Sequence, residues 1–123
     1  MKYIYKNITG STATDLELYD EYTGEYANML LCNVHVSDAV TVDLYITKTV
    51  SNDERFSVGE NGNWDALTTI DFTYYILKTV NIPLGATLSL DHNDLIFDST
   101  EYDLYIKLNA ADSAVDITLY KTN

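Results

Sequence analysis

The chain has 123 residues, of which 19 are acidic and 7 are basic, and its formal net charge is −12. This charge argues against binding to nucleic acid or to an anionic membrane, because both need clustered lysines and arginines. It favours solubility and a basic partner. The length predicts one domain, residues 1–123, whose core needs no disulfide, and the single cysteine cannot form one within the chain.

The N-terminal segment lacks the apolar run of a signal peptide, and no later run approaches the length of a membrane span. Synthesis in the cytoplasm is therefore expected. The chain contains 11 tyrosines but only 5 glycines and 1 proline. This composition excludes a disordered or collagen-like chain, and tyrosine at this density favours strands and contact surfaces.

Apolar and polar residues alternate with period 2 along much of the chain, whereas helical periodicity is almost absent. An all-β antiparallel sandwich, Ig-like or jelly-roll-like, is predicted from short strands at this spacing. Residues 1–13 are expected to begin with a plain first strand, and an N-terminal arm that reaches a partner is the alternative. About nine strands are predicted in chain order, at residues 2–9, 14–19, 26–36, 40–49, 72–82, 86–91, 95–98, 102–108 and 115–121.

Three of these strands have one wholly apolar face, which predicts the core. The opposite face of each strand shows a tyrosine: Tyr45, Tyr105 and Tyr120. The core residues predicted in this way are Val40, Val42, Leu44, Ile46, Leu104, Ile106, Leu108, Val115, Ile117 and Leu119.

Residues 51–71 interrupt the alternation with charges, an Asn-Gly pair and the only tryptophan. The preferred interpretation is a hairpin with a type I′ turn at Asn61 and Gly62, which would place Phe56 opposite Trp64. The alternative is that Phe56 or Trp64 is exposed and anchors a partner.

Cys32 and His35 are three residues apart in the predicted strand 26–36. On a strand this spacing puts them on opposite faces, so a catalytic Cys-His pair is not expected. Cys32 is predicted on the core face with Leu30 and Val34, and His35 on the other face. The whole segment is interpreted as two strands around a turn.

Two acidic segments, residues 91–94 and 60–65, could supply oxygen ligands to Ca²⁺, but neither has the spacing of an EF-hand loop. Turn formation by Asp and Asn is the preferred interpretation. Paired carboxylates of a hydrolase have no distinguishing pattern here. No metal, cofactor or catalytic residue is predicted, and the chain is expected not to be an enzyme.

The segments 32–45, 74–78, 82–88 and 102–107 resemble small virion structural proteins of tailed bacteriophages. In those proteins a "CN-H-S-A-VTVDLY" hairpin is followed by a "YYLLK-V-IP-G-TL" strand and turn. In the turn, Pro83 presets φ and Gly85 can adopt positive φ. The resemblance covers residues 29–120, whereas residues 1–28 have no counterpart. The charged segment 51–71 and the tyrosine-rich segment 18–26 depart from the pattern.

The resemblance implies a non-enzymatic protein on the virion that decorates or cements the capsid through protein–protein contacts. Its partners would be the major capsid protein or other virion proteins, and several copies would assemble as a homo-oligomer. A neck or tail accessory protein is one alternative. A carbohydrate- or receptor-binding sandwich that stacks aromatic rings on sugars is another. The residues predicted to make contacts are Tyr22, Tyr26, Tyr45, Phe56, Trp64, Tyr105 and Tyr120.

Overall fold

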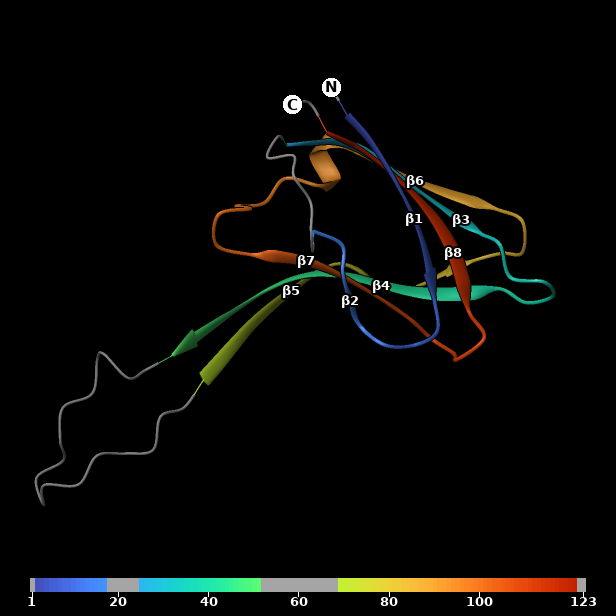
Figure 1. Ribbon diagram of the computed structural model, residues 1–123, viewed down its shortest axis with the longest axis horizontal. Coiled ribbons are helices and arrows are strands. Elements are labelled where there is room, and N and C mark those ends of the chain that lie inside the picture. The colour runs from blue at the N-terminus through green and yellow to red at the C-terminus, as the bar shows by residue number, and fades with distance from the viewer. Residues whose placement is uncertain (1, 18–24, 52–68, 122–123) are drawn as a thin grey trace, which may run out of the picture.

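A computed structural model describes residues 2–17, 25–51 and 69–121. Two four-stranded antiparallel sheets pack as a sandwich of eight strands (Figure 1). One sheet has the order β1-β8-β3-β6 and the other β2-β7-β4-β5. The elements are β1 (Lys2–Thr9), β2 (Thr14–Asp15), β3 (Tyr26–Asn33), β4 (Val40–Ser51), β5 (Thr69–Ile82), β6 (Thr87–Asp91), the short 3-10 helix η1 (His92–Asp94), β7 (Asp103–Leu108) and β8 (Ala114–Lys121).

The strand pairs are nested around the β4–β5 hairpin. β4 pairs with β5, β3 with β6, β2 with β7 and β1 with β8, all antiparallel. A long four-pair hairpin rolled into two sheets in this way is a jelly roll, so the structure selects this topology over the Ig-like alternative. None of the described segments forms a helix long and apolar enough to cross a membrane.

The core lies between the sheets, and the predicted apolar faces of β4, β7 and β8 form much of it. Val42, Leu44 and Leu104 are fully buried. The prediction for these strands is confirmed, because their alternation leaves one arrangement that keeps polar groups in water. The structure adds core residues from other elements, including Leu16, Met29, Leu31, Ile82, Leu90 and Leu95.

The predicted orientation of β3 is wrong. Leu31, Asn33 and His35 are buried, whereas Val34 is exposed and Cys32 is only partly buried. Both faces of this strand carry apolar residues, so alternation alone did not distinguish them. Asn33 enters the core side because its side-chain amide donates to the carbonyls of Ile82 (2.9 Å) and Asp38 (3.0 Å).

The segment 32–45 contains two strands around a turn, as predicted, but β3 and β4 belong to different sheets and do not pair with each other. The connection turns a corner of the sandwich instead. The predicted strand 95–98 is irregular chain after η1, with Leu95 buried in the core. The turn at Pro83 is confirmed: Gly85 has φ of +74° and Ala86 N–H donates to the Pro83 carbonyl at 3.0 Å.

Two predicted strands at the N-terminal end have different outcomes. β1 pairs with β8 along its whole length, from Lys2↔Lys121 to Thr9↔Ala114, and thus forms a sheet strand within the chain. The predicted strand 14–19 is reduced to β2 within the described residues, and it includes positions that lie outside them. The predicted hairpin around Asn61 and Gly62 lies outside the described residues as well.

The β4–β5 hairpin extends beyond the sandwich (Figure 1). The last pair between β4 and β7 is Thr47↔Asp103, whereas β4 and β5 stay paired as far as Ser51↔Thr69. We call residues 48–51 and 69–72 the projecting ribbon. The rest of the sandwich is the body.

Candidate functional site

The outer face of the sheet β2-β7-β4-β5 carries a row of three tyrosines. Tyr105, Tyr45 and Tyr75 are neighbours on adjacent strands. The ring centroids of Tyr45 and Tyr105 are 5.8 Å apart, and those of Tyr45 and Tyr75 are 5.4 Å apart. The ammonium of Lys78 lies 4.3 Å from the centroid of Tyr75. The row is therefore an organised polar-aromatic surface with a cation at one end.

Burial raises the pKa of the phenols of Tyr45 and Tyr105 above 10.0, and nearby negative charge adds to the effect. Both hydroxyls therefore keep their protons at neutral pH and can donate hydrogen bonds. The two rings lie nearly parallel, with an interplanar angle of 11° at 5.8 Å, and so contact each other. Two of the tyrosines predicted to make contacts thus lie side by side on one face.

Tyr120 lies on the outer face of the other sheet. Its ring centroid is 4.5 Å from that of Tyr3, which belongs to the edge strand β1. Tyr3 and Tyr5 are exposed, at 60% and 72%, and their rings stack on each other. The predicted contact residues Tyr45 and Tyr105 lie on one outer face and Tyr120 on the other, so the described members do not converge on one site.

The prediction of Tyr26 as a surface contact is wrong, because this residue is only 3% exposed. Its hydroxyl donates to Glu17 at 3.0 Å, and the ammonium of Lys121 lies 4.7 Å from its ring centroid. A ring covered in this way cannot stack on a sugar. The other aromatic residues of that alternative, Tyr22, Phe56 and Trp64, lie outside the described residues.

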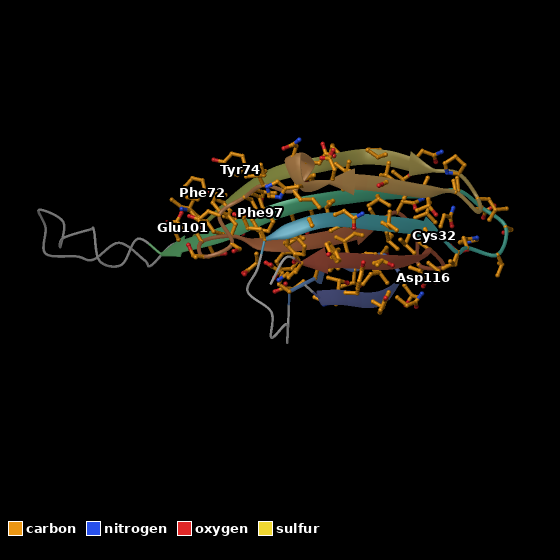
Figure 2. All side chains as sticks on the ribbon, turned by 90° about the horizontal axis from the view of Figure 1, so that it is seen from above. Cys32, Phe72, Tyr74, Phe97, Glu101 and Asp116 are labelled. Carbon is orange, nitrogen blue, oxygen red and sulfur yellow. The ribbon has the colours of Figure 1, made fainter. Side chains whose placement is uncertain are left out.

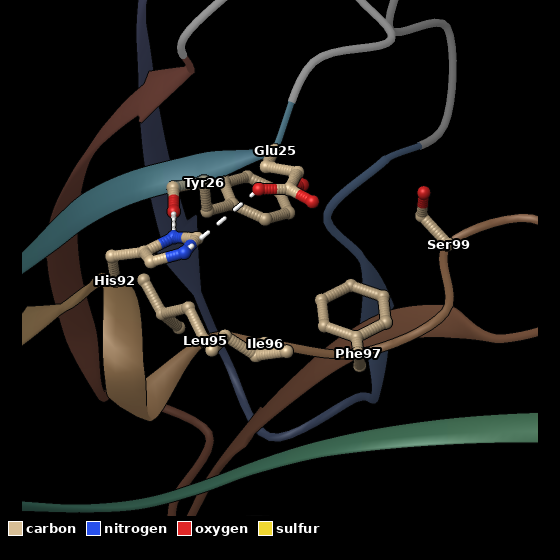
Figure 3. Close-up of a pocket in the computed structure, with 7 residues that line it drawn as sticks. All are labelled: Glu25, Tyr26, His92, Leu95, Ile96, Phe97 and Ser99. Carbon is tan, nitrogen blue, oxygen red and sulfur yellow. Dashed lines mark hydrogen bonds and ion pairs between the residues drawn. The ribbon is translucent and has the colours of Figure 1, made fainter.

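A cavity beside Tyr26 is small. It is lined by Glu25, Tyr26, His92, Leu95, Ile96, Phe97 and Ser99 (Figure 3), and its volume is about 30 Å³. His92 donates from Nδ1 to the Tyr26 carbonyl at 2.9 Å and lies 3.8 Å from Glu25 through Nε2. A cavity that admits only a few water molecules is too small for a sugar ring.

His35 belongs to the one group in the described part of the chain that could hold a metal, together with Asp38 and Asp112. Its Nδ1 accepts from the backbone N–H groups of Ser37 (3.0 Å) and Asp38 (2.9 Å). The ring proton is therefore on Nε2, which lies 3.1 Å from Asp112.

A metal on Nε2 of His35 would require the proton to move to Nδ1, where it would face two N–H donors. A metal on Nδ1 would displace both hydrogen bonds. We therefore assign this group a structural role, in which His35 holds the turn between β3 and β4. In the acidic segment 91–94, Asp91 Oδ1 accepts from the N–H groups of Asn93 and Asp94, as turn chemistry predicted. The acidic segment 60–65 lies outside the described residues.

The projecting ribbon exposes apolar side chains that sequence reasoning did not select. Ile70 is 45% exposed and Phe72 is 38% exposed, and next to the ribbon Tyr74 is 56% exposed. Phe72, Tyr74 and Glu101 gather at the base of the ribbon, far from Cys32 and Asp116 (Figure 2). Ile70, Phe72 and Tyr74 alternate with polar residues along β5, and this alternation begins within the charged segment 51–71. That continuity was the sequence signal for an exposed extension of the strand.

An open groove runs along β4 where β7 begins. It has a volume of about 400 Å³ and is lined by Thr47, Lys48, Thr49, Glu101, Asp103 and Tyr105. Lys48 crosses it to reach Glu101 at 3.2 Å. The hydrogen bond and the charge of Glu101 raise the pKa of Lys48, and Lys48 thus remains a cation at neutral pH.

Comparison of the chain with protein-family models, curated proteins and solved structures finds no match.

Proposed function

We propose that the chain is a non-enzymatic structural protein of a tailed-bacteriophage virion, which decorates or cements the capsid through protein–protein contacts. The observation that carries the proposal is the projecting ribbon. It places Ile70 and Phe72 in water, away from the core that their alternation would otherwise fill. Apolar surface exposed on an extended element is typical of a contact with another protein.

The fold and the sequence resemblance support the same proposal by different routes. Jelly rolls occur in viral capsid domains, but also in lectins and cupins, so the fold alone is an analogy. The residues that carry the resemblance to phage virion proteins include β4 and the turn after β5. β4 is the strand that continues into the ribbon, and the turn at residues 83–86 lies at the opposite end of β5, where it joins β5 to β6 in the other sheet.

The chemistry of the described residues favours a binding role. The cavity near Tyr26 has room for only a few water molecules, and His35 accepts hydrogen bonds from the turn that it organises. The open groove beside β4 has no nucleophile paired with a base; it holds a Lys48–Glu101 ion pair and polar side chains. An acidic protein outside a shell would also not compete for packaged DNA.

The test is quantitative mass spectrometry of purified particles that encode this chain, with the major capsid protein as the reference. A copy number close to that of the capsid protein is expected for decoration or cement. A few copies per particle would replace this proposal with the neck or tail position. The absence of the chain from gently purified particles would contradict a virion role.

A further inference from the structure

β4 has an open edge along the projecting ribbon. On the side of β7 its last described partner is Asp103, which pairs with Thr47. From Lys48 to Ser51 it pairs with β5 alone among the described strands. Successive residues of a strand direct their N–H and C=O groups to alternate sides, so on this side the donors and acceptors have no strand partner among the described residues. An edge of this kind can pair with another strand.

The groove follows this edge. Thr47, Lys48 and Thr49 are consecutive in β4, and the side chains of consecutive strand residues point to opposite faces of the sheet. Thr47 and Thr49 share the outer face of the sheet with Asp103 and Tyr105, and Lys48 reaches the groove through its ion pair with Glu101, so the groove lies on that face beside the edge. The other residues that line it are Glu101, which precedes β7, and Asp103 and Tyr105 in β7. An added strand would occupy the position that β7 leaves vacant.

Apolar side chains lie on one face of the same segment. Lys48 pairs with Phe72, and Val50 pairs with Ile70. The ammonium of Lys48 lies 5.9 Å from the centroid of Phe72 and 5.1 Å from that of Tyr102. A strand beside β4 would cover part of this face with its own apolar side chains, in addition to forming backbone hydrogen bonds.

The charges select a basic partner over a second copy. Asp103 is exposed, and Glu101 is 56% exposed although it pairs with Lys48. Two copies of a chain with a net charge of −12 would repel each other at this edge. Lysine or arginine side chains on an incoming strand would instead meet these two carboxylates.

We propose that the edge of β4 at residues 48–51 binds an extended, positively charged segment of a partner protein as an added strand, in line with β7. The segment alternates apolar side chains toward Phe72 and cations toward Glu101 and Asp103. The inference rests on the proposed function only in that it takes the partner to be a protein on the same particle.

The test uses the full chain labelled with ¹⁵N and a capped peptide of alternating lysine and valine, about eight residues long. Backbone amide shifts at residues 48–51 and 101–103 are expected, with slower hydrogen exchange at alternate residues of 48–51. The same peptide with alternate backbone nitrogens methylated is expected to bind at least about tenfold more weakly, because it cannot complete the ladder. Equal binding by the methylated peptide would overturn strand addition.

Charge variants test the recognition of cations. Asp103→Lys is expected to weaken binding of the lysine-valine peptide about tenfold, since it reverses a charge in the groove. Asp116→Lys makes the same change of net charge on the outer face of the other sheet, far from the ribbon (Figure 2), and is expected to change binding less than about twofold. Equal weakening by both variants would mean non-specific attraction and would overturn the proposed site. The methylated peptide tests the same edge on the unaltered chain if Asp103→Lys does not fold.

Two further outcomes separate this inference from the proposed function. If the chain is present on particles but the peptide leaves the amides of residues 48–51 unchanged, the edge proposal is wrong and the virion role stands. Binding of the peptide by a chain absent from particles would support the edge and contradict the virion role. Amide shifts at residues 48–51 that depend on protein concentration, without peptide, would mean that a second copy occupies the edge and would overturn the basic partner.

Discussion

β4 and β5 run through both the body and the projecting ribbon, yet their apolar side chains are buried in the body and exposed in the ribbon. In the body, Val42 and Leu44 of β4 are fully buried against the second sheet. In the ribbon, Ile70 and Phe72 of β5 are 45% and 38% exposed. The alternation of apolar and polar residues continues from one region into the other. What differs is the presence of an opposite sheet.

The body and the ribbon therefore contribute to different properties, namely stability and binding. Two strands alone are marginally stable in water, so the ribbon depends on the body to hold it. The body obtains its stability from side chains packed between the two sheets. A ribbon that contributes little to stability but exposes apolar groups and a strand edge is suited to binding. Changes in the two regions should therefore affect different measurements.

Truncation in the core should cost much more stability than truncation in the ribbon. Ile106→Ala is expected to lower the free energy of unfolding by about 2–5 kcal/mol, because Ile106 is fully buried and the deletion leaves a cavity. Phe72→Ala should lower it by less than about 1 kcal/mol, since part of the ring already contacts water. Urea unfolding followed by circular dichroism measures both. Similar losses would contradict the distinction between body and ribbon.

The stability of the turn between β3 and β4 should depend on the imidazole ring of His35 much more than on its exposed partner Asp112. His35→Ala is expected to lower the free energy of unfolding by about 2–3 kcal/mol, because two backbone N–H groups lose their acceptor. Asp112→Ala should cost at most about 1 kcal/mol, since the Asp112 side chain is 73% exposed. The same urea experiment compares them. Equal costs would show that the ion pair, and not the turn, is what matters.

Thr79 should respond to glycine with the opposite sign from a regular strand residue near the ribbon. Thr79 has φ of +54°, a region unfavourable for a β-branched residue, and its N–H donates to Asp43 at 2.7 Å. Thr79→Gly keeps this hydrogen bond, relieves the strain and should raise stability by about 0.5–1 kcal/mol. Thr73→Gly in the regular part of β5 should lower it by about 0.5–1 kcal/mol. Thermal unfolding midpoints that fall for both variants would contradict the strain.

The smallest expected effect is a pH dependence from Glu17 in the body. Burial raises the pKa of its carboxyl above 4.5, although hydrogen bonding from Tyr26 and the charge of Lys121 oppose the shift. The folded state therefore binds this proton more tightly than the unfolded state. Its contribution to stability grows as pH falls through the raised pKa, is complete below 4.5, and is lost as pH rises.

Glu17→Gln isolates this contribution, because glutamine keeps an acceptor for Tyr26 but does not titrate. Unfolding curves measured in steps of pH above 4.5 should show a more positive slope of stability against pH for the variant than for the original chain. An identical slope for the two proteins would mean that Glu17 does not carry the effect.

The sequence predicted the fold class and the core faces of β4, β7 and β8, because only one face of each is apolar. It failed for β3, whose two faces are both largely apolar. There the choice depends on Asn33, whose amide reaches the carbonyl of Ile82 in another sheet. That hydrogen bond joins residues far apart in the chain, so a local sequence pattern cannot predict it.

The candidate site was less predictable than the fold. Tyrosine content indicated contact surfaces but did not separate Tyr26, buried beneath Lys121, from Tyr45 and Tyr105 on an outer face. The ribbon was missed because the residues of β5 alternate in the same way whether or not a second sheet covers them. Exposure is a property of the neighbouring elements and is not visible in the strand.

Strand periodicity, the turn at Pro83 and Gly85, and the negative charge follow from the residues alone, because each depends on side-chain chemistry or on local backbone geometry. The nested order of the strands, the face of β3 that enters the core, and the open edge of β4 depend on which segments meet in space. β7 begins at Asp103, which pairs with Thr47, whereas β4 continues to Ser51. The edge therefore comes from where β7 begins relative to β4, and neither strand shows this in its own sequence.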